Sequence, residues 1–260
     1  MTTTAADLRK AYYESRPGWM DGTTQFRRMI EERLQPGCCL LDVGAGAGGS
    51  LHLDLRAPGR RVVGIDLAPE VRLNPHLDEA HCCDAAQLPF GDEQFDLAFA
   101  DYVFEHLADP LAVVREIRRV LKPGGYMLLR TPNKWHYVPL LARLVPDAMQ
   151  GSLLERCTGR RAEEVFPKFY RCNTEGAVRR AFEQEGFVLE TLQYVEKEPA
   201  YFVRYPLLYR AGVAYEKLVN STGWLRNLRS NLFAAFRKPS ETASVPHPFS
   251  GSECKHAPGP

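Results

Sequence analysis

A glycine-rich turn with an aspartate just before it carries the clearest chemistry in this sequence. Asp42 lies two residues ahead of Gly44, and Gly46 and Gly48 follow at alternate positions. Glycines after a buried strand let the backbone turn sharply and approach a ligand closely. If Gly49 instead of Gly48 is taken as the third glycine, the spacing also fits the Gly-x-Gly-x-x-Gly pattern of dinucleotide sites. A carboxylate before the turn gains nothing from a pyrophosphate but suits a ligand with an ammonium group, which favours the Gly-x-Gly-x-Gly interpretation.

Two further aspartates close the next two apolar runs. Asp66 lies 24 residues after Asp42, where a carboxylate can accept both hydrogen bonds of a ribose diol. Asp84 could accept a hydrogen bond from an exocyclic adenine amine, with the amide of Ala85 nearby. Either aspartate alone is explained as well by a helix cap. Three aspartates at successive strand ends, together with a glycine turn, favour a nucleotide-like ligand.

The elements that must position these residues alternate along the chain. Short, almost continuously apolar runs are typical of parallel strands covered on both faces. Apolar residues at helical spacing separate several of them. This alternation predicts a doubly wound α/β sheet with right-handed crossovers. The predicted strands are Cys38–Val43, Arg61–Asp66, His81–Ala85, Phe95–Ala100 and Tyr126–Thr131, and the predicted helices are Gln25–Leu34, Pro110–Leu121 and Thr174–Glu185.

The segments LLDVGAGAG, VVGID, CDAAQLPFGDEQFDLAFADYVFEHLADP and REIRRVLKPGGYMLLRTPN closely resemble class I S-adenosylmethionine-dependent methyltransferases of the type 11 family. The resemblance covers about residues 38–133 and implies a Rossmann-like sheet of seven strands with helices on both faces and helical additions. It also implies a penultimate strand at Gly186–Leu192, a final antiparallel strand inserted near one edge of the sheet, and S-adenosylmethionine as cofactor. The cofactor-binding residues that it implies are Asp42, Gly44, Ala45, Gly46, Gly48, Asp66, Leu67, Asp84, Ala85 and Leu88.

Three side chains after the fourth strand are candidates for catalysis: Asp101, Glu105 and His106. The chemistry of the family is an in-line displacement, and a base is needed only when the acceptor is a hydroxyl or an acidic carbon. His106 is the best candidate base, because the ordinary pKa of histidine lies near neutrality. The alternative is that Glu105 and His106 cap a helix or support the cofactor loop.

Residues 134–172 and 199–238 depart from the minimal fold, so we expect the acceptor site there. The aromatic residues and arginines of the second segment either cover a hydrophobic acceptor, lie at a membrane interface, or form helices packed on the sheet edge. The sequence lacks the Asn/Asp-Pro-Pro-Tyr/Phe and Pro-Cys motifs of amide and nucleobase enzymes, which favours a small-molecule acceptor and no nucleic-acid partner. The candidate acceptor-binding residues are Tyr102, Trp135, His136, Tyr137, Tyr205 and Tyr209.

The composition is that of an ordinary globular protein. The 260 residues carry a net charge of +1, with 45% hydrophobic and 25% charged residues. Neither a membrane-spanning run nor a signal sequence is recognisable, and seven cysteines without a C-x-x-C motif favour buried reduced thiols and no metal site. These features predict a cytoplasmic protein, with membrane association as an open alternative.

Four units are predicted along the chain: an N-terminal helical segment (1–35), the cofactor-binding core (36–198), a basic amphipathic helical extension (199–238) and a disordered tail (239–260). Charge is unevenly divided. Residues 40–110 hold thirteen acidic and four basic side chains, whereas residues 199–238 hold one acidic and seven basic. The extension therefore meets an anionic surface or packs against the acidic half.

The leading hypothesis is methyl transfer to an oxygen of a sugar, quinone-like or polyketide-like metabolite, which includes lipid-linked acceptors. A nicotinamide-dependent oxidoreductase would keep the glycine turn but leaves Asp42 and the Lys-Pro-Gly-Gly turn unexplained. A cofactor-binding scaffold without turnover is the third hypothesis. The sequence predicts neither the acceptor nor the oligomeric state.

Overall fold

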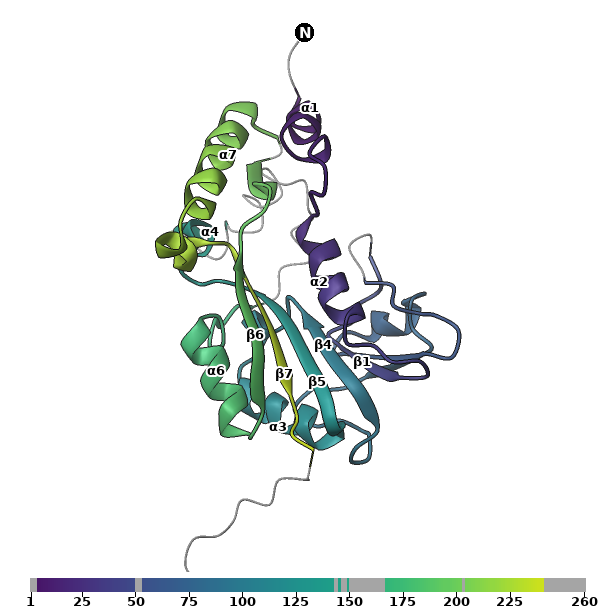
Figure 1. The fold of residues 1–260 in the computed structure, drawn as a ribbon. Coiled ribbons are helices and arrows are strands. Elements are labelled where there is room, and N and C mark those ends of the chain that lie inside the picture. The colour runs from purple at the N-terminus through teal and green to yellow at the C-terminus, as the bar shows by residue number, and fades with distance from the viewer. Residues whose placement is uncertain are drawn as a thin grey trace, which may run out of the picture.

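A seven-stranded mixed sheet forms the centre of the molecule (Figure 1). The computed structural model describes residues 4–49, 53–142, 145, 149, 167–202 and 204–240. The strand order is β3-β2-β1-β4-β5-β7-β6. The strands are β1 (Cys39–Val43), β2 (Arg61–Asp66), β3 (Glu79–Cys82), β4 (Phe95–Asp101), β5 (Leu121–Pro132), β6 (Val188–Val195) and β7 (Asn231–Arg237).

The order of the strands reverses beside β1, which pairs in parallel with both β2 and β4. In open α/β sheets this switch point leaves a crevice at the carboxyl ends of the strands, where ligands bind. The glycine turn begins there, directly after β1. The predicted doubly wound, Rossmann-like sheet of seven strands is confirmed.

Helices cover both faces of the sheet. On one face, α3 (Pro110–Val120) and α6 (Glu175–Gln184) pack their apolar sides on β1, β4, β5 and β7. On the other face, α2 (Gly22–Glu31) places Phe26, Met29 and Ile30 against the opposite sides of the same strands. Asp21 begins α2 by accepting the backbone N–H of Thr24 at 2.8 Å. The central strands are therefore buried on both sides, as their apolar composition predicts.

β7 corrects the predicted extent of the core. It is the last strand in the chain, yet it lies between β5 and β6 and is antiparallel to both. Residues Leu232–Phe236 are fully buried. The prediction that residues 199–238 form a helical extension outside the core is therefore wrong for 231–237. The two alanines weaken the strand pattern, and the apolar residues before them continue the helical spacing of the preceding segment.

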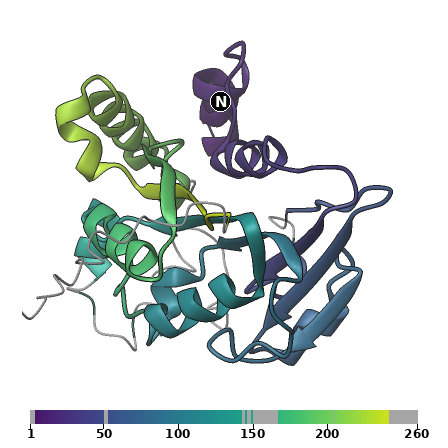
Figure 2. The same cartoon turned by 60° about the horizontal axis from the view of Figure 1, so that its bottom comes forward.

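The remainder of the C-terminal segment is helical and meets the N-terminal helices. It contains η5 (Ala200–Phe202), α7 (Pro206–Asn220) and η6 (Gly223–Leu228). A small apolar cluster of Leu8, Tyr13, Tyr209 and Val213 joins α7 to α1 (Ala5–Arg9) and η1 (Lys10–Glu14). Figures 1 and 2 show these helices extending from one end of the sheet. We call α1, η1 and α7 the cap.

Several local predictions need adjustment. No helix forms between β1 and β2 within residues 44–49 and 53–60, although a glycine turn of this kind predicts one. The third strand begins and ends earlier than predicted, at Glu79 and Cys82. Cys82 is exposed rather than buried, whereas Cys38 and Cys172 are buried. Two cysteines, most of the predicted insertion after residue 142 and the tail from residue 241 lie outside the described residues.

Shorter elements complete the described chain. They are η2 (Pro69–Leu73), η3 (Phe104–His106) and α4 (Tyr137–Ala142). Within the described residues no helix is long and apolar enough to cross a membrane.

The inner position of β7, between β5 and β6, predicts the effect of truncation. A chain that ends after residue 198 loses five fully buried side chains of β7. The three large ones, Leu232, Phe233 and Phe236, each contribute about 1.5–3 kcal/mol, a sum comparable with the whole stability of a typical domain. It should show no cooperative urea unfolding by circular dichroism. A chain that ends after residue 240 is the control and should unfold cooperatively. A cooperative transition in the shorter chain would show that β7 is dispensable.

Candidate functional site at the carboxyl edge of the sheet

The glycine turn is held against β2 by main-chain hydrogen bonds. The N–H groups of Gly44 and Ala45 both donate to the carbonyl oxygen of Ile65, at 2.8 and 2.9 Å. Gly44 has a φ of +76°, and a Cβ added there would lie 2.4 Å from Cγ2 of Val103. Only glycine fits this position, because both the dihedral angle and the space exclude a side chain.

Asn74 clamps the turn from the side, a role that sequence analysis missed. Its buried Nδ2 donates to the carbonyl oxygens of Ala45 and Gly46, at 3.0 and 3.2 Å. A Cβ on Gly48 would lie 2.4 Å from its Oδ1, so this glycine is required for close packing. The Asn-Pro pair after η2 signals a turn, but nothing local in the sequence indicates its distant partner.

The three aspartates differ in their surroundings. Asp42 is buried, and this burial, reinforced by the charges of Asp101 and Asp66, holds the pKa of its carboxyl well above the ordinary value. Asp66 accepts the backbone N–H groups of Gly46 and Ala68, each at 2.9 Å. Asp84 accepts the N–H of Ala86 at 2.9 Å and thereby closes a local turn. Asp42 and Asp66 thus border the glycine turn directly.

The apolar residues predicted around the cofactor divide into exposed and buried. Leu67, just after β2, is 72% exposed. Leu88 is buried in the core between the sheet and α3, and its N–H donates to Glu116 at 2.9 Å. Ala85 is half-buried. Leu88 therefore contributes to packing in this structure, whereas Leu67 stays accessible.

Arg130 forms an ion pair with the carboxylate of Asp101. Its Nε and Nη2 each donate to one oxygen of Asp101 at 2.5 Å, a bidentate pair. The guanidinium is buried and also lies 4.5 Å from the ring centroid of Tyr102. The hydroxyl of Tyr102 donates to Asn231 at the start of β7, at 3.0 Å. Asp101 is thus tied to a cation, which makes it a positioning group rather than a ready proton acceptor.

His106 is held in one tautomer by the main chain. Its Nδ1 lies 2.7 Å from the carbonyl oxygen of Pro167. A carbonyl can only accept, so Nδ1 carries the hydrogen and Nε2 carries the lone pair in the neutral ring. Burial, together with the charge of Lys168, lowers the pKa of this imidazole. The neutral, proton-accepting form is therefore favoured near neutral pH.

Glu105 lies behind His106 and is buried. Its Oε1 is 3.9 Å from Nε2 of His106, and its Oε2 accepts the hydroxyl of Thr131 at 3.2 Å. Asn173 in turn donates to that hydroxyl at 2.6 Å. Burial raises the pKa of Glu105 to about 7, although the bond from Thr131 opposes the shift. Thr131 and Asn173 are members of the site that sequence analysis missed.

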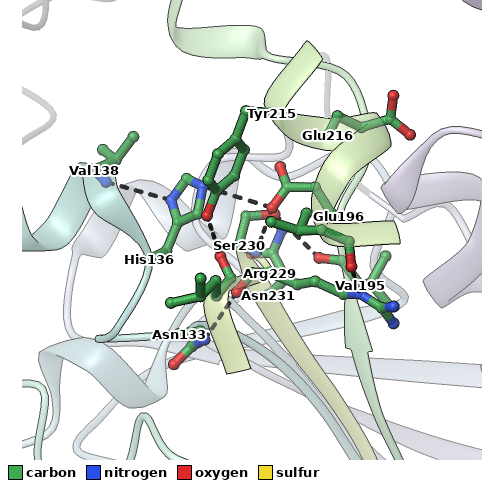
Figure 3. A network of polar contacts seen from close by, with 12 residues as sticks. Asn133, His136, Val138, Val195, Glu196, Tyr215, Glu216, Arg229, Ser230 and Asn231 are labelled. Carbon is green, nitrogen blue, oxygen red and sulfur yellow. Dashed lines mark hydrogen bonds and ion pairs between the residues drawn. The ribbon is translucent and has the colours of Figure 1, made fainter. Parts of the chain in front are cut away.

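A second buried histidine lies farther along the same edge (Figure 3). Nδ1 of His136 accepts the N–H of Val138 at 3.4 Å, and its Nε2 is 3.5 Å from Oε2 of Glu196. Burial lowers the pKa of His136 to about 4 and raises that of Glu196 to about 8. The N–H of Ser230 donates to the same carboxyl oxygen at 2.7 Å. The pair is therefore neutral at pH 7, and it links the ends of β5, β6 and β7.

The remaining predicted acceptor residues separate in space. Trp135 is half-exposed, and the ring of Tyr137 packs edge-on against Tyr215 of α7. Tyr205 is exposed at the start of α7, whereas Tyr209 is buried against Tyr13 inside the cap. The structure therefore does not bring Tyr205 and Tyr209 together on one open surface.

Within the described residues, no group of three or more His, Cys, Asp or Glu side chains could hold a metal ion.

The part of this chain that holds the glycine turn is similar in sequence to known proteins. A family model described as "Methyltransferase domain" matches residues 41–129. A probable S-adenosylmethionine-dependent methyltransferase of Mycolicibacterium smegmatis is 37% identical over 132 residues, 47% of this chain and 51% of that protein. A ubiquinone biosynthesis O-methyltransferase of Ruegeria pomeroyi is 38% identical over 117 residues, 42% of this chain and 46% of that protein. The chain thus spans about half the length of these curated relatives.

Among solved structures, the [4+2]-cyclase SpnF has a similar fold. It superposes with a TM-score of 0.55 at 20% identity, covering 88% of this chain and 87% of SpnF. At this level of identity the likeness shows the fold alone.

The raised pKa of Glu105 predicts a pH-dependent stability. The folded protein holds the proton to about pH 7, whereas the unfolded chain releases it near the ordinary value of 4.5. The free energy of unfolding should therefore fall as the pH rises between these values, by on the order of 3 kcal/mol. Glu105→Gln, which does not titrate, should gain stability relative to wild type over this range, measured by urea unfolding at pH 4.5 and 8. If the difference in unfolding free energy between the variant and wild type does not change with pH, the pKa of Glu105 is not raised and its carboxyl is in contact with water. Glu196 is present in both proteins, so its own titration cancels.

Proposed function

We propose that the protein is a class I S-adenosylmethionine-dependent methyltransferase of the type 11 family, and that it methylates a hydroxyl oxygen of a small, apolar, quinone-like acceptor. The observation that carries the proposal is the tautomer of His106. A neutral imidazole with its lone pair on Nε2 follows β4, at the same edge of the sheet as the glycine turn.

The residues of the turn fit the cofactor. A sulfonium with an ammonium group calls for carboxylates, and Asp42 and Asp66 border the turn. A Cβ on Gly46 would meet nothing within 4 Å, so the backbone there is open to a ligand. We propose that Asp42 holds the ammonium and Asp66 the ribose hydroxyls. S-adenosylmethionine supplies an activated methyl group when bound.

His106 is the reason why we propose an oxygen atom as the methyl acceptor. A hydroxyl must lose its proton as it attacks the methyl carbon, and a neutral imidazole can accept that proton at Nε2. The buried Glu105, 3.9 Å from Nε2, is placed to stabilise the imidazolium that results. Asp101 keeps Arg130 and the ring of Tyr102 in position beside the site.

Exposed aromatic rings support an apolar acceptor. Tyr102 lies four residues before His106, and Phe169, whose N–H donates to the carbonyl of Glu105 at 2.8 Å, lies beside it. Both rings are at least 40% exposed. Exposed aromatic faces suit a flat, apolar ring, whereas the several hydroxyls of a sugar would also call for polar partners. The relative from Ruegeria pomeroyi, named for ubiquinone biosynthesis, is consistent with a quinone-like class.

Asp66→Ala tests the cofactor site. We expect the affinity for S-adenosylmethionine, measured by calorimetry, to fall by about 1.5–3 kcal/mol, or roughly 10- to 100-fold, through loss of charged hydrogen bonds. Asp92→Ala, at a largely exposed carboxylate on the opposite end of the sheet, is the matched control. Unchanged affinity in a folded Asp66→Ala protein would remove Asp66 from the site.

His106→Ala tests the base. Turnover of a hydroquinone acceptor, followed by tritiated-methyl transfer, should fall by about 10²–10⁴-fold with little change in cofactor affinity. In wild type the rate should rise with pH and level off, with a midpoint below the ordinary histidine pKa of 6.5, because only the neutral ring accepts a proton. The variant should lose this inflection. His81→Ala, on β3, is the control. Equal losses of binding and turnover would assign His106 a structural role.

A further inference from the structure

Helix α7 is apolar on two opposite sides. Its inner side buries Tyr209, Val213 and Val219 in the molecule. Its outer side carries a second apolar row, spaced four, three and four residues apart, which places its members on one face of a helix. The members of this row are Leu207, Ala211, Ala214 and Leu218, and all four are exposed.

Both leucines of the row are well exposed, and two further large apolar side chains of the same segment are exposed as well. Leu207 is 79% exposed and Leu218 is 58% exposed. Leu208 is half-exposed, and Trp224, in η6 directly after the helix, is 96% exposed. We call the row formed by Leu207, Ala211, Ala214 and Leu218 the outer face of α7, with Leu208 and Trp224 exposed close to it in the chain. A single exposed leucine is ordinary, whereas a contiguous row of this kind marks an interaction site.

The charges around this face are of one sign. Arg204, Arg210 and Lys217 are exposed at or beside the helix. The one acidic side chain of α7, Glu216, turns inward, where it accepts the amide of Asn220 at 2.8 Å and lies 3.5 Å from the hydroxyl of Tyr13. The exposed charges of α7 are therefore positive.

We propose that the outer face of α7 binds the surface of an anionic lipid bilayer. A helix with leucines on one face, arginines and lysines beside them and an exposed tryptophan after its last turn lies in the plane of a membrane interface, with the apolar side chains among the acyl chains. Basic side chains at that depth pair with anionic head groups. Tryptophan is the residue most suited to the boundary between acyl chains and water.

The position of α7 gives this contact a consequence. Tyr215 of the same helix packs against His136 and Tyr137 at the carboxyl edge of the sheet. Figures 1 and 2 both show α7 extending from that end of the molecule. A protein bound through the outer face therefore presents its candidate acceptor side to the bilayer. The lipid contact itself stands independently of the proposed methyl transfer.

Vesicle binding tests the proposal directly. The full-length protein should sediment with vesicles of phosphatidylglycerol and phosphatidylcholine, and less with pure phosphatidylcholine. The bound fraction should fall as the salt concentration rises, because the electrostatic part is screened within about 10 Å at 0.1 M. Equal binding to both vesicle types, or none to either, would overturn the proposal.

Two pairs of variants assign the contact to α7. Leu207→Ser with Leu218→Ser should weaken partitioning by on the order of tenfold or more. Val188→Ser, which changes a 56% exposed residue at the opposite end of the sheet, should bind as wild type. Arg204→Glu with Arg210→Glu should weaken binding to anionic vesicles only. Arg115→Glu with Arg180→Glu, on α3 and α6, makes the same change of charge and should have no such effect.

Circular dichroism of each variant checks folding, and the arginine pair keeps the test valid if the leucine pair is unfolded. Vesicle binding by the α7 variants at the wild-type level would overturn the proposal. A second copy of this chain is the alternative partner for an apolar face, and sedimentation equilibrium tests for such self-association. Self-association that the leucine pair abolishes, together with absent vesicle binding, would make the outer face of α7 a contact between copies of this chain.

Discussion

The insertion of β7 between β5 and β6 is the constraint on which the rest of the molecule depends. β6 ends at the carboxyl edge with Val195, and β7, antiparallel to it, begins at the same edge with Asn231. The connection between them must therefore start and finish at that edge, and α7 is carried there by topology alone. The apolar cluster around Tyr13 and Tyr209 then fixes the N-terminal helices to α7. The cap exists because the last strand is an inner one.

Several acidic groups lie close together at the carboxyl edge of the sheet, and their surroundings deal with the negative charge of each in a different way. Asp101 has the buried cation of Arg130, and Asp66 has two backbone N–H groups of the turn region. Asp42 and Glu105 are buried, and burial raises the pKa values of both carboxyl groups. A cationic ligand at this edge would relieve the repulsion among these carboxylates. This electrostatic demand is the physical reason why the edge suits a sulfonium cofactor better than a pyrophosphate.

The two histidines of this edge show how surroundings divide equivalent side chains into different roles. His106 is partly accessible, and a carbonyl oxygen on Nδ1 leaves Nε2 able to accept a proton. His136 is almost fully buried, and its Nδ1 accepts a backbone N–H, which places the hydrogen on Nε2 toward Glu196. We propose that the first accepts a proton, whereas the second connects three strand ends and the cap. Position in the sequence alone does not distinguish them.

The sequence by itself determined the parallel strands, the glycine turn and the order of Asp42 and Asp66, because these rest on local spacing and on the rule that parallel strands end at one edge. Tertiary structure alone decided which groups meet. Asn74 clamps the turn, Arg130 binds Asp101, and Glu196 meets a histidine sixty residues away in the chain. It also decided that residues 231–237 form the inserted inner strand β7, because this short apolar run becomes a strand only when it forms hydrogen bonds with both β5 and β6. Such pairings depend on contacts between distant segments, which no local pattern records.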